Sequence, residues 1–164
     1  MEIFHITLIL ATLLCSLVAG FLFAFAVVVM PGIRSLNDKE FIRAFQVMDR
    51  VIQNNQPVFM LVWVGSIMVV ITSVVLGIGL LDGVDRLLLI FAALTYLLGV
   101  QLPTLTINVP LNNKLQTLDV DAMNEIAQES SREAFEPRWN HWNIIRTAVS
   151  SLVSVLFIIL LFRS

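Results

Sequence analysis

Long apolar stretches alternate along the chain with shorter segments that are rich in polar and charged residues. Residues 6–30, 57–81 and 87–113 contain no charged side chain, and residues 144–162 contain one, Arg146. Each of the first three stretches exceeds the roughly 20 residues that a helix needs to cross a bilayer. The fourth is slightly short, but an arginine can extend its charged end to the lipid head groups. The pattern predicts membrane-spanning helices at about residues 6–30, 57–81, 87–110 and 143–162.

The segment at about residues 38–54 has the pattern of an amphipathic helix. Charged side chains fall between apolar residues that recur at helical spacing, and Asp38 is the expected N-cap. We expect this helix to lie on the membrane surface or to cap the bundle. Its apolar positions are Phe41, Phe45, Met48 and Ile52.

A second amphipathic helix is predicted at about residues 120–136. Met123, Ile126 and Ala127 would form its apolar edge. Proline suits the first turn of a helix, where its missing N–H costs nothing. The fourth spanning helix is therefore expected to begin at Pro137, as an element separate from the amphipathic one.

The third span carries an unusual number of polar residues. If the helix continues, its polar side chains fall on one stripe, because the second, third and fourth of them lie three, seven and eleven residues after Gln101. Pro103 and Pro110 each remove a backbone donor. We therefore expect the helix to kink at Pro103 and to end near Pro110. The stripe consists of Gln101, Thr104, Asn108 and Asn112.

Four spans place the N-terminus, the short turn at residues 82–86 and the C-terminus on one side of the membrane. Both long loops then lie on the other side, and they carry most of the lysine and arginine. The positive-inside rule places these loops in the cytoplasm. The chain is thus expected to be a single transmembrane domain over residues 1–164, located in a bacterial inner (plasma) membrane. Its fold class is all-α: an integral membrane four-helix bundle with two amphipathic helices in the long loops on one membrane face.

Composition supports a membrane protein and excludes several other classes. Hydrophobic residues make up 58% of the chain, charged residues only 13%, and the net charge is −2, which gives no basic surface for nucleic acid. No spacing typical of a metal site occurs, so neither a metal nor another cofactor is expected. Membrane lipids are the expected partners, an apolar small-molecule ligand is a further one, and a homo-oligomer is left open.

Polar residues from three spans gather at the membrane face of the long loops. If a helix runs from Pro137, then Trp139, Trp142, Asn143 and Arg146 lie within about 100° of one another, whereas His141 points to the opposite side. A charge at the depth of Arg146 usually faces the interior of a bundle. The residues expected near this face also include Asn54, Asn108 and Asn112.

Four stretches of the chain resemble the anthrone-oxygenase-like family of small four-span membrane proteins. They are GFLFAFAVVVMPG (20–32), FQVMDRVIQNNQPVFMLVWVG (45–65), NVPLNN (108–113) and RWNHWNIIRT (138–147). The resemblance implies a four-helix bundle, and some members are linked to oxidation of anthrones to anthraquinones without a metal or flavin. The family often has a histidine at the position of Ile144.

Two functions follow from these features. The first is a cofactor-independent oxygenase that acts on an apolar aromatic molecule of the anthrone or quinone kind, with Asp49 as a weaker candidate base. The second is a non-catalytic membrane protein that binds a lipid, a quinone or a partner subunit. For the first, the candidate catalytic residues are Arg146, Asn108, Asn143 and His141, and the candidate substrate-binding residues are Asn112, Trp139, Trp142 and Asn54.

Overall fold

Four helices of the computed structural model, which describes residues 2–163, are long and apolar enough to cross a membrane. This confirms the predicted all-α membrane bundle. The first span runs through α1 (Glu2–Ala24), η1 (Phe25–Val29) and α2 (Met30–Ile33). The second is α4 (Pro57–Leu80), and the third runs through α5 (Gly83–Tyr96), η2 (Leu97–Gln101), η3 (Thr104–Asn108) and α6 (Val109–Gln116). The fourth is α7 (Glu125–Arg163), and α3 (Asp38–Gln53) connects the first two spans.

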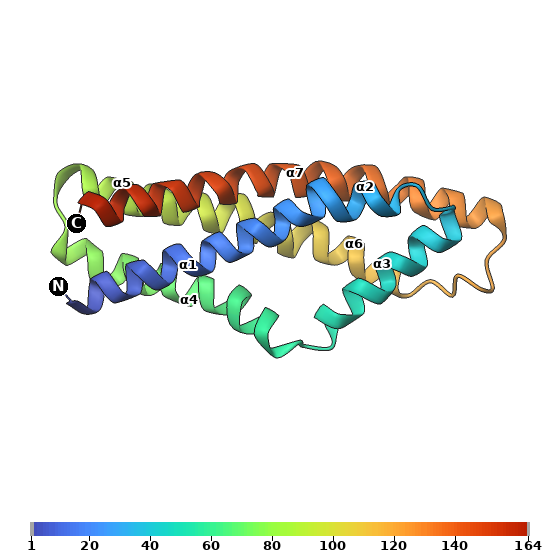
Figure 1. The fold of residues 1–164 in the computed structure, drawn as a ribbon, viewed down its shortest axis with the longest axis horizontal. Helices are drawn as coiled ribbons and strands as arrows, with labels where there is room; N and C mark the ends of the chain where they lie inside the picture. Colours follow the sequence, from blue (N-terminus) through green and yellow to red (C-terminus); the bar gives the residue numbers. More distant parts are fainter. Residues whose placement is uncertain (1, 164) are drawn as a thin grey trace.

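The two ends of the bundle differ in character. Both termini and the turn between α4 and α5 lie at one end, while α3 and the start of α7 lie at the other (Figure 1). Side chains of α1, α4, α5 and α7 form an apolar core, in which Tyr96 is fully buried. Both long loops therefore lie at one end of the molecule, as the sequence predicted.

Each of the three π-helical turns ends two residues before a proline. Pro31 follows η1, Pro103 follows η2, and Pro110 follows η3. A proline ring clashes with the carbonyl four residues earlier in a regular α-helix, and each of these carbonyls lies within a π-turn, which is wider by one residue. The third span therefore continues to Gln116. The expected end near Pro110 is wrong, because the π-turns accommodate both prolines.

The predicted second amphipathic helix and the fourth span form one continuous helix of 39 residues, with Pro137 in its interior. The expectation of a new helix at Pro137 is therefore wrong. The helix begins after Asn124, whose side chain accepts a hydrogen bond from the backbone N–H of Ala127 at 2.9 Å. Its buried side carries Gln128 and Phe135, whereas Ile126 is 77% exposed. Packing against α3 thus selects a different face from the one expected.

The connecting segments form a second packed layer beyond the apolar core. Phe41, Phe45, Phe135 and Trp139 belong to one buried cluster that joins α3 to α7. Gln46 of α3 donates hydrogen bonds to the carbonyl of Leu115 in α6 at 2.8 Å and to that of Leu118 just after α6 at 3.0 Å. Hence α3 caps the bundle, the second of the two expected arrangements.

Charged contacts fix the outer edge of this layer. Asn37, not Asp38, is the N-cap of α3, since its side chain accepts a hydrogen bond from the N–H of Glu40. At the other side of the helix, Lys39 and Arg43 both pair with the exposed Asp121. The hydrogen bond from Lys39, and then the charge of Arg43, hold the pKa of the Asp121 carboxyl below its usual range.

Candidate functional site

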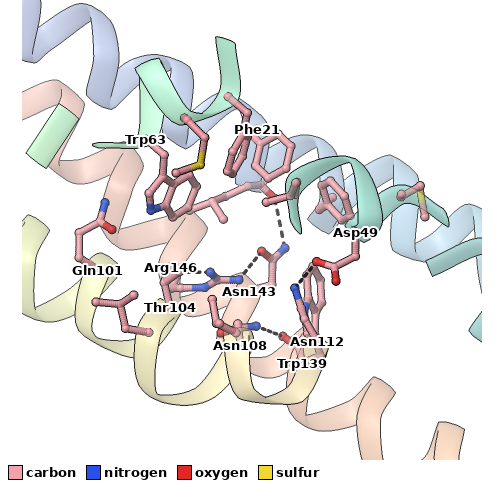
Figure 2. Close-up of a pocket in the computed structure, with 18 of the residues that line it drawn as sticks. Phe21, Asp49, Trp63, Gln101, Thr104, Asn108, Asn112, Trp139, Asn143 and Arg146 are labelled. Atoms are coloured by element: carbon pink, nitrogen blue, oxygen red, sulfur yellow. Dashed lines mark hydrogen bonds between the residues drawn. The ribbon is translucent and has the colours of Figure 1, made fainter. Parts of the chain in front are cut away.

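A cavity of about 300 Å³ lies where the spanning helices meet the α3 layer. This volume is at the lower end of the range for small-molecule sites, roughly 300–1,000 Å³. Aromatic and aliphatic side chains of α1, α3 and α4 form most of its wall, and polar side chains come from the third span, α3 and α7 (Figure 2). The polar residues that line it are Asp49, Gln101, Thr104, Asn108, Asn112, Asn143 and Arg146.

Arg146 is the cation of the cavity. Its side chain is buried, with 3% exposed, and it donates hydrogen bonds to Thr104 Oγ1 at 2.9 Å and to Asn143 Oδ1 at 3.1 Å. Among residues 2–163, no carboxylate lies within ion-pair distance of this guanidinium, and its Nε atom has no hydrogen-bond partner. A buried cation without an acidic partner is costly, so Arg146 is prepared to receive an anion or a developing negative charge.

Both residues that bind Arg146 are themselves held by the backbone of the bundle. Asn143 Nδ2 donates to the carbonyl of Leu22 in α1 at 3.1 Å, and Thr104 Oγ1 donates to the carbonyl of Val100 at 2.7 Å. Arg146 therefore has a fixed position between α1, α7 and the third span, and it needs no rearrangement to act on a bound ligand.

Asp49 is the carboxylate of the cavity, and it is buried with only 4% exposed. Its Oδ1 accepts from Asn112 at 2.7 Å, while Oδ2 accepts from Gln53 at 2.7 Å and from Gln116 at 3.1 Å. These three donors are neutral amides, and among residues 2–163 no cation forms an ion pair with the carboxylate. A carboxylate so placed has lone pairs available for a proton at the cavity surface.

Trp139 and Asn112 connect the carboxylate to the rest of the polar wall. Trp139 Nε1 donates to Asn112 Oδ1 at 2.8 Å, and the Trp139 carbonyl accepts from Asn108 Nδ2 at 3.4 Å. The Oδ1 atom of Asn108 is buried without a partner. Arg146 Nε is likewise buried without a partner, and both atoms belong to residues that line the cavity.

The structure brings five of the eight predicted site residues to this cavity, namely Arg146, Asn108, Asn143, Asn112 and Trp139. The other three do not line it. His141 is exposed on the opposite side of α7, as its helical phase predicted, and half-buried Trp142 contacts the His141 ring. Asn54 is exposed at the C-terminal end of α3.

Sequence reasoning undervalued Asp49 and missed the aromatic wall. Asp49 lies four residues after Phe45 on the buried face of α3, and a carboxylate on an apolar helix face is a signal that the sequence already contained. Nothing in the pattern of hydrophobic residues separates Phe21, Phe59 and Trp63, which line the cavity, from residues that face lipid.

Two further observations limit what the cavity holds and how it is reached. Within the described residues, no three His, Cys, Asp or Glu side chains are grouped so that they could bind a metal ion. Val64 of α4 and Leu105 of the third span line the cavity and are also 46% and 63% exposed. The cavity therefore extends to the lipid-facing surface between these two helices.

Comparison with known proteins gives one match. Residues 48–156, about two thirds of the chain, match the model of a family described as anthrone oxygenase. No curated protein and no solved structure matches the chain. The matched range contains Asp49 and all of the polar cavity residues of the third span and of α7.

Proposed function

Because this chain belongs to the anthrone oxygenase family, we propose that it oxidises an apolar aromatic ketone of the anthrone class with dioxygen. One observation carries the proposal: two buried ionisable groups line the same largely apolar cavity. They are the carboxylate of Asp49 and the guanidinium of Arg146, which forms no ion pair among the described residues. Base and cation are the two groups that such a reaction needs.

The proposed reaction begins with the acidic methylene group of the anthrone. Asp49 accepts one proton from it, and the remaining electron pair moves into the ring system, so that negative charge develops on the ketone oxygen. The guanidinium of Arg146 donates to that oxygen and stabilises the charge, an effect that is large where most of the lining side chains are apolar.

Dioxygen then takes the electrons of this anion, and a new C–O bond forms at the former methylene carbon. The resulting peroxide anion takes up the proton that Asp49 removed and becomes a hydroperoxide. The hydroperoxide loses water when its O–O bond breaks and the second C–H proton leaves with the released hydroxide. The methylene carbon becomes a carbonyl, one oxygen atom is retained, and the other leaves as water. The substrate supplies the electrons and dioxygen accepts them, so the scheme requires no resident cofactor.

The departure of this chain from the family pattern at Ile144 is compatible with this scheme. Ile144 is 60% exposed and does not line the cavity. A histidine at that position would lie on the side of α7 that faces away from Asp49 and Arg146. The base in this cavity is therefore proposed to be Asp49 in place of His141, which lies outside it.

The proposal is tested with purified protein, anthrone and ¹⁸O₂. We expect enzyme-dependent formation of anthraquinone with one ¹⁸O atom, at a rate above that of the same amount of heat-denatured protein. Binding of anthrone without oxygen consumption would instead favour the second candidate, a membrane protein that binds an aromatic or quinone ligand in the same cavity.

Substrate is proposed to enter from the bilayer, since the cavity reaches the lipid-facing surface at Val64. We expect Val64→Trp to lower kcat/KM about tenfold, mainly through KM, because filling a preformed space with a larger side chain costs roughly 1–3 kcal/mol. Val75→Trp is the matched control. Val75 lies on the same face of α4, is 69% exposed and does not line the cavity. Equal kinetics for the two variants would contradict entry at this surface.

The long loops are proposed to face the cytoplasm of a bacterial cell, since they carry most of the lysine and arginine. The only native cysteine, Cys15, is buried, so cysteines introduced singly at exposed positions report on their own location. In intact cells, an impermeant maleimide is expected to label Gly83→Cys and to leave Asn54→Cys unlabelled until the cells are opened. The reverse pattern would overturn the orientation and leave the site unaffected.

A further inference from the structure

We infer that Trp139 is a positioning residue for the proposed base: its indole N–H fixes the amide of Asn112, and Asn112 holds the oxygen of Asp49 that receives the proton. The inference rests on the proposed function, because it explains how the cavity presents that base. Trp139 lies in α7, Asn112 in α6 and Asp49 in α3, so distant parts of the chain supply the three side chains. Figure 2 shows Asn112 beside Trp139, with its amide bonded to Asp49.

The indole settles the orientation of the Asn112 amide. An indole N–H can donate a hydrogen bond but cannot accept one. Trp139 Nε1 lies 2.8 Å from Asn112 Oδ1, so the oxygen of the amide faces the indole and its NH₂ group points elsewhere. That NH₂ group donates to Asp49 Oδ1 at 2.7 Å. The indole therefore commits Asn112 to be a donor to the carboxylate.

Packing of the indole ring fixes the direction of its N–H. The Trp139 side chain is only 5% exposed. The rings of Phe25, Phe45 and Phe135 surround it, with centroid distances of 5.7, 5.4 and 6.2 Å. A large ring in such close packing has little room to turn, so the N–H stays directed at Asn112.

The two oxygens of Asp49 are used differently. An ionised carboxylate has about four acceptor positions, two on each oxygen. Oδ2 accepts from both Gln53 and Gln116, whereas Oδ1 accepts from Asn112 alone in the described part of the chain. The open position is thus on Oδ1, and this oxygen receives the proton of the substrate. The orientation of Asn112 decides where that position points.

The donors to Oδ2 can replace one another, but Asn112 has no such substitute. Without Gln53, Oδ2 still accepts from Gln116, whose NH₂ group is also fixed by the carbonyl of Gln46 at 2.7 Å. Without the indole N–H, the Asn112 amide can turn its oxygen toward Asp49 once the carboxyl is protonated. The acid would then donate its proton to Asn112 in a hydrogen bond and would not return it to the peroxide.

Three variants that each change one tryptophan to phenylalanine test the role of the N–H. We expect Trp139→Phe to lower kcat for anthrone oxidation about tenfold, as the loss of one hydrogen bond predicts. Trp63 also lines the cavity, where it stacks on Phe59, so Trp63→Phe should raise KM and change kcat less than about twofold. Trp142 lies outside the cavity, and Trp142→Phe should leave both constants unchanged. Equal losses of kcat in Trp139→Phe and Trp63→Phe would overturn the inference.

A double-mutant cycle identifies the path through Asn112. Asn112→Leu removes the amide, and in this background Trp139→Phe should lower kcat less than about twofold, because the indole acts through the amide. A further tenfold loss, on the order of that in the single variant, contradicts the inference. If Trp139→Phe does not fold, β-benzothienylalanine at position 139 gives the same test, since sulfur replaces the N–H in a ring system of the same shape.

Infrared spectroscopy without substrate separates this inference from the oxygenase. The carboxylate band of Asp49 is the band that disappears in Asp49→Asn. We expect it to shift in Trp139→Phe and in Asn112→Leu and to stay in place in Trp142→Phe. An unchanged band in Trp139→Phe overturns the inference. A shifted band in a protein that never turns over anthrone supports the role of Trp139 in holding Asp49 and contradicts the oxygenase.

Discussion

Replacing Asp49 with asparagine is expected to lower kcat for anthrone oxidation at least about a hundredfold, because a positioned general base contributes roughly 10²–10⁴ to a rate. The side chain keeps its size and one acceptor oxygen, so Asn112 and its neighbours retain much of their arrangement. The loss should appear in kcat, with little change in the dissociation constant of anthraquinone. Rates are measured from anthraquinone formation under dioxygen.

The controls for this variant separate a base from a structural residue. Gln53→Leu removes one of the donors to Asp49 but leaves the carboxylate, and Asp121→Asn removes an exposed carboxylate of the loop layer. Both should retain most of the wild-type kcat. Substrate deuterated at the methylene group is expected to react more slowly with the wild type, because the proposed first step breaks this C–H bond. An Asp49→Asn variant with wild-type kcat would eliminate Asp49 as the base.

Replacing Arg146 with methionine is expected to lower kcat/KM about 10²–10³-fold, the range for removing one donor to a developing oxyanion. The same change should not destabilise the protein. Arg146 is buried without a carboxylate partner among the described residues, and replacing buried charge with an apolar side chain of similar length is often neutral or stabilising. Anthraquinone formation and thermal unfolding in detergent measure the two effects.

The combination of lost activity and retained stability distinguishes a site from a structural bridge. If Arg146 mainly joined Thr104 to Asn143 across the bundle, Arg146→Met would unfold at a lower temperature and would lose activity only in proportion. Arg138→Met is the control, since Arg138 is exposed on the same helix and does not line the cavity. Unchanged kcat/KM in Arg146→Met would show that the guanidinium takes no part in the proposed reaction.

The elements that the sequence predicted best are those whose signal is long and apolar. Four charge-free or nearly charge-free stretches can only be buried in lipid or in one another, so their number and the gathering of both long loops at one end of the molecule followed from the pattern. The polar face of α7 followed as well, because helical phase places Asn143 and Arg146 together and His141 opposite.

The ends of helices were predicted less well, because prolines were given their ordinary local meaning. Pro110 and Pro137 both lie inside helices in the structure. The π-turn before Pro110 relieves the clash with the preceding turn. At Pro137, burial of Phe135 and Trp139 against α3 favours one continuous helix over a break. The π-turn thus accommodates Pro110 locally, whereas contacts with distant residues outweigh the local preference at Pro137.

The sequence alone determined that this protein is a four-span helical bundle, which family it resembles, and which polar side chains of the third and fourth spans share a face, since these follow from hydrophobicity and helical period. Only the tertiary structure decided that α3 brings Asp49 to the same cavity as Arg146, and that Arg146 Nε is buried without a partner among residues 2–163. The reason is that a cavity and an unused hydrogen bond depend on how helices from distant parts of the chain pack, and no local pattern records that.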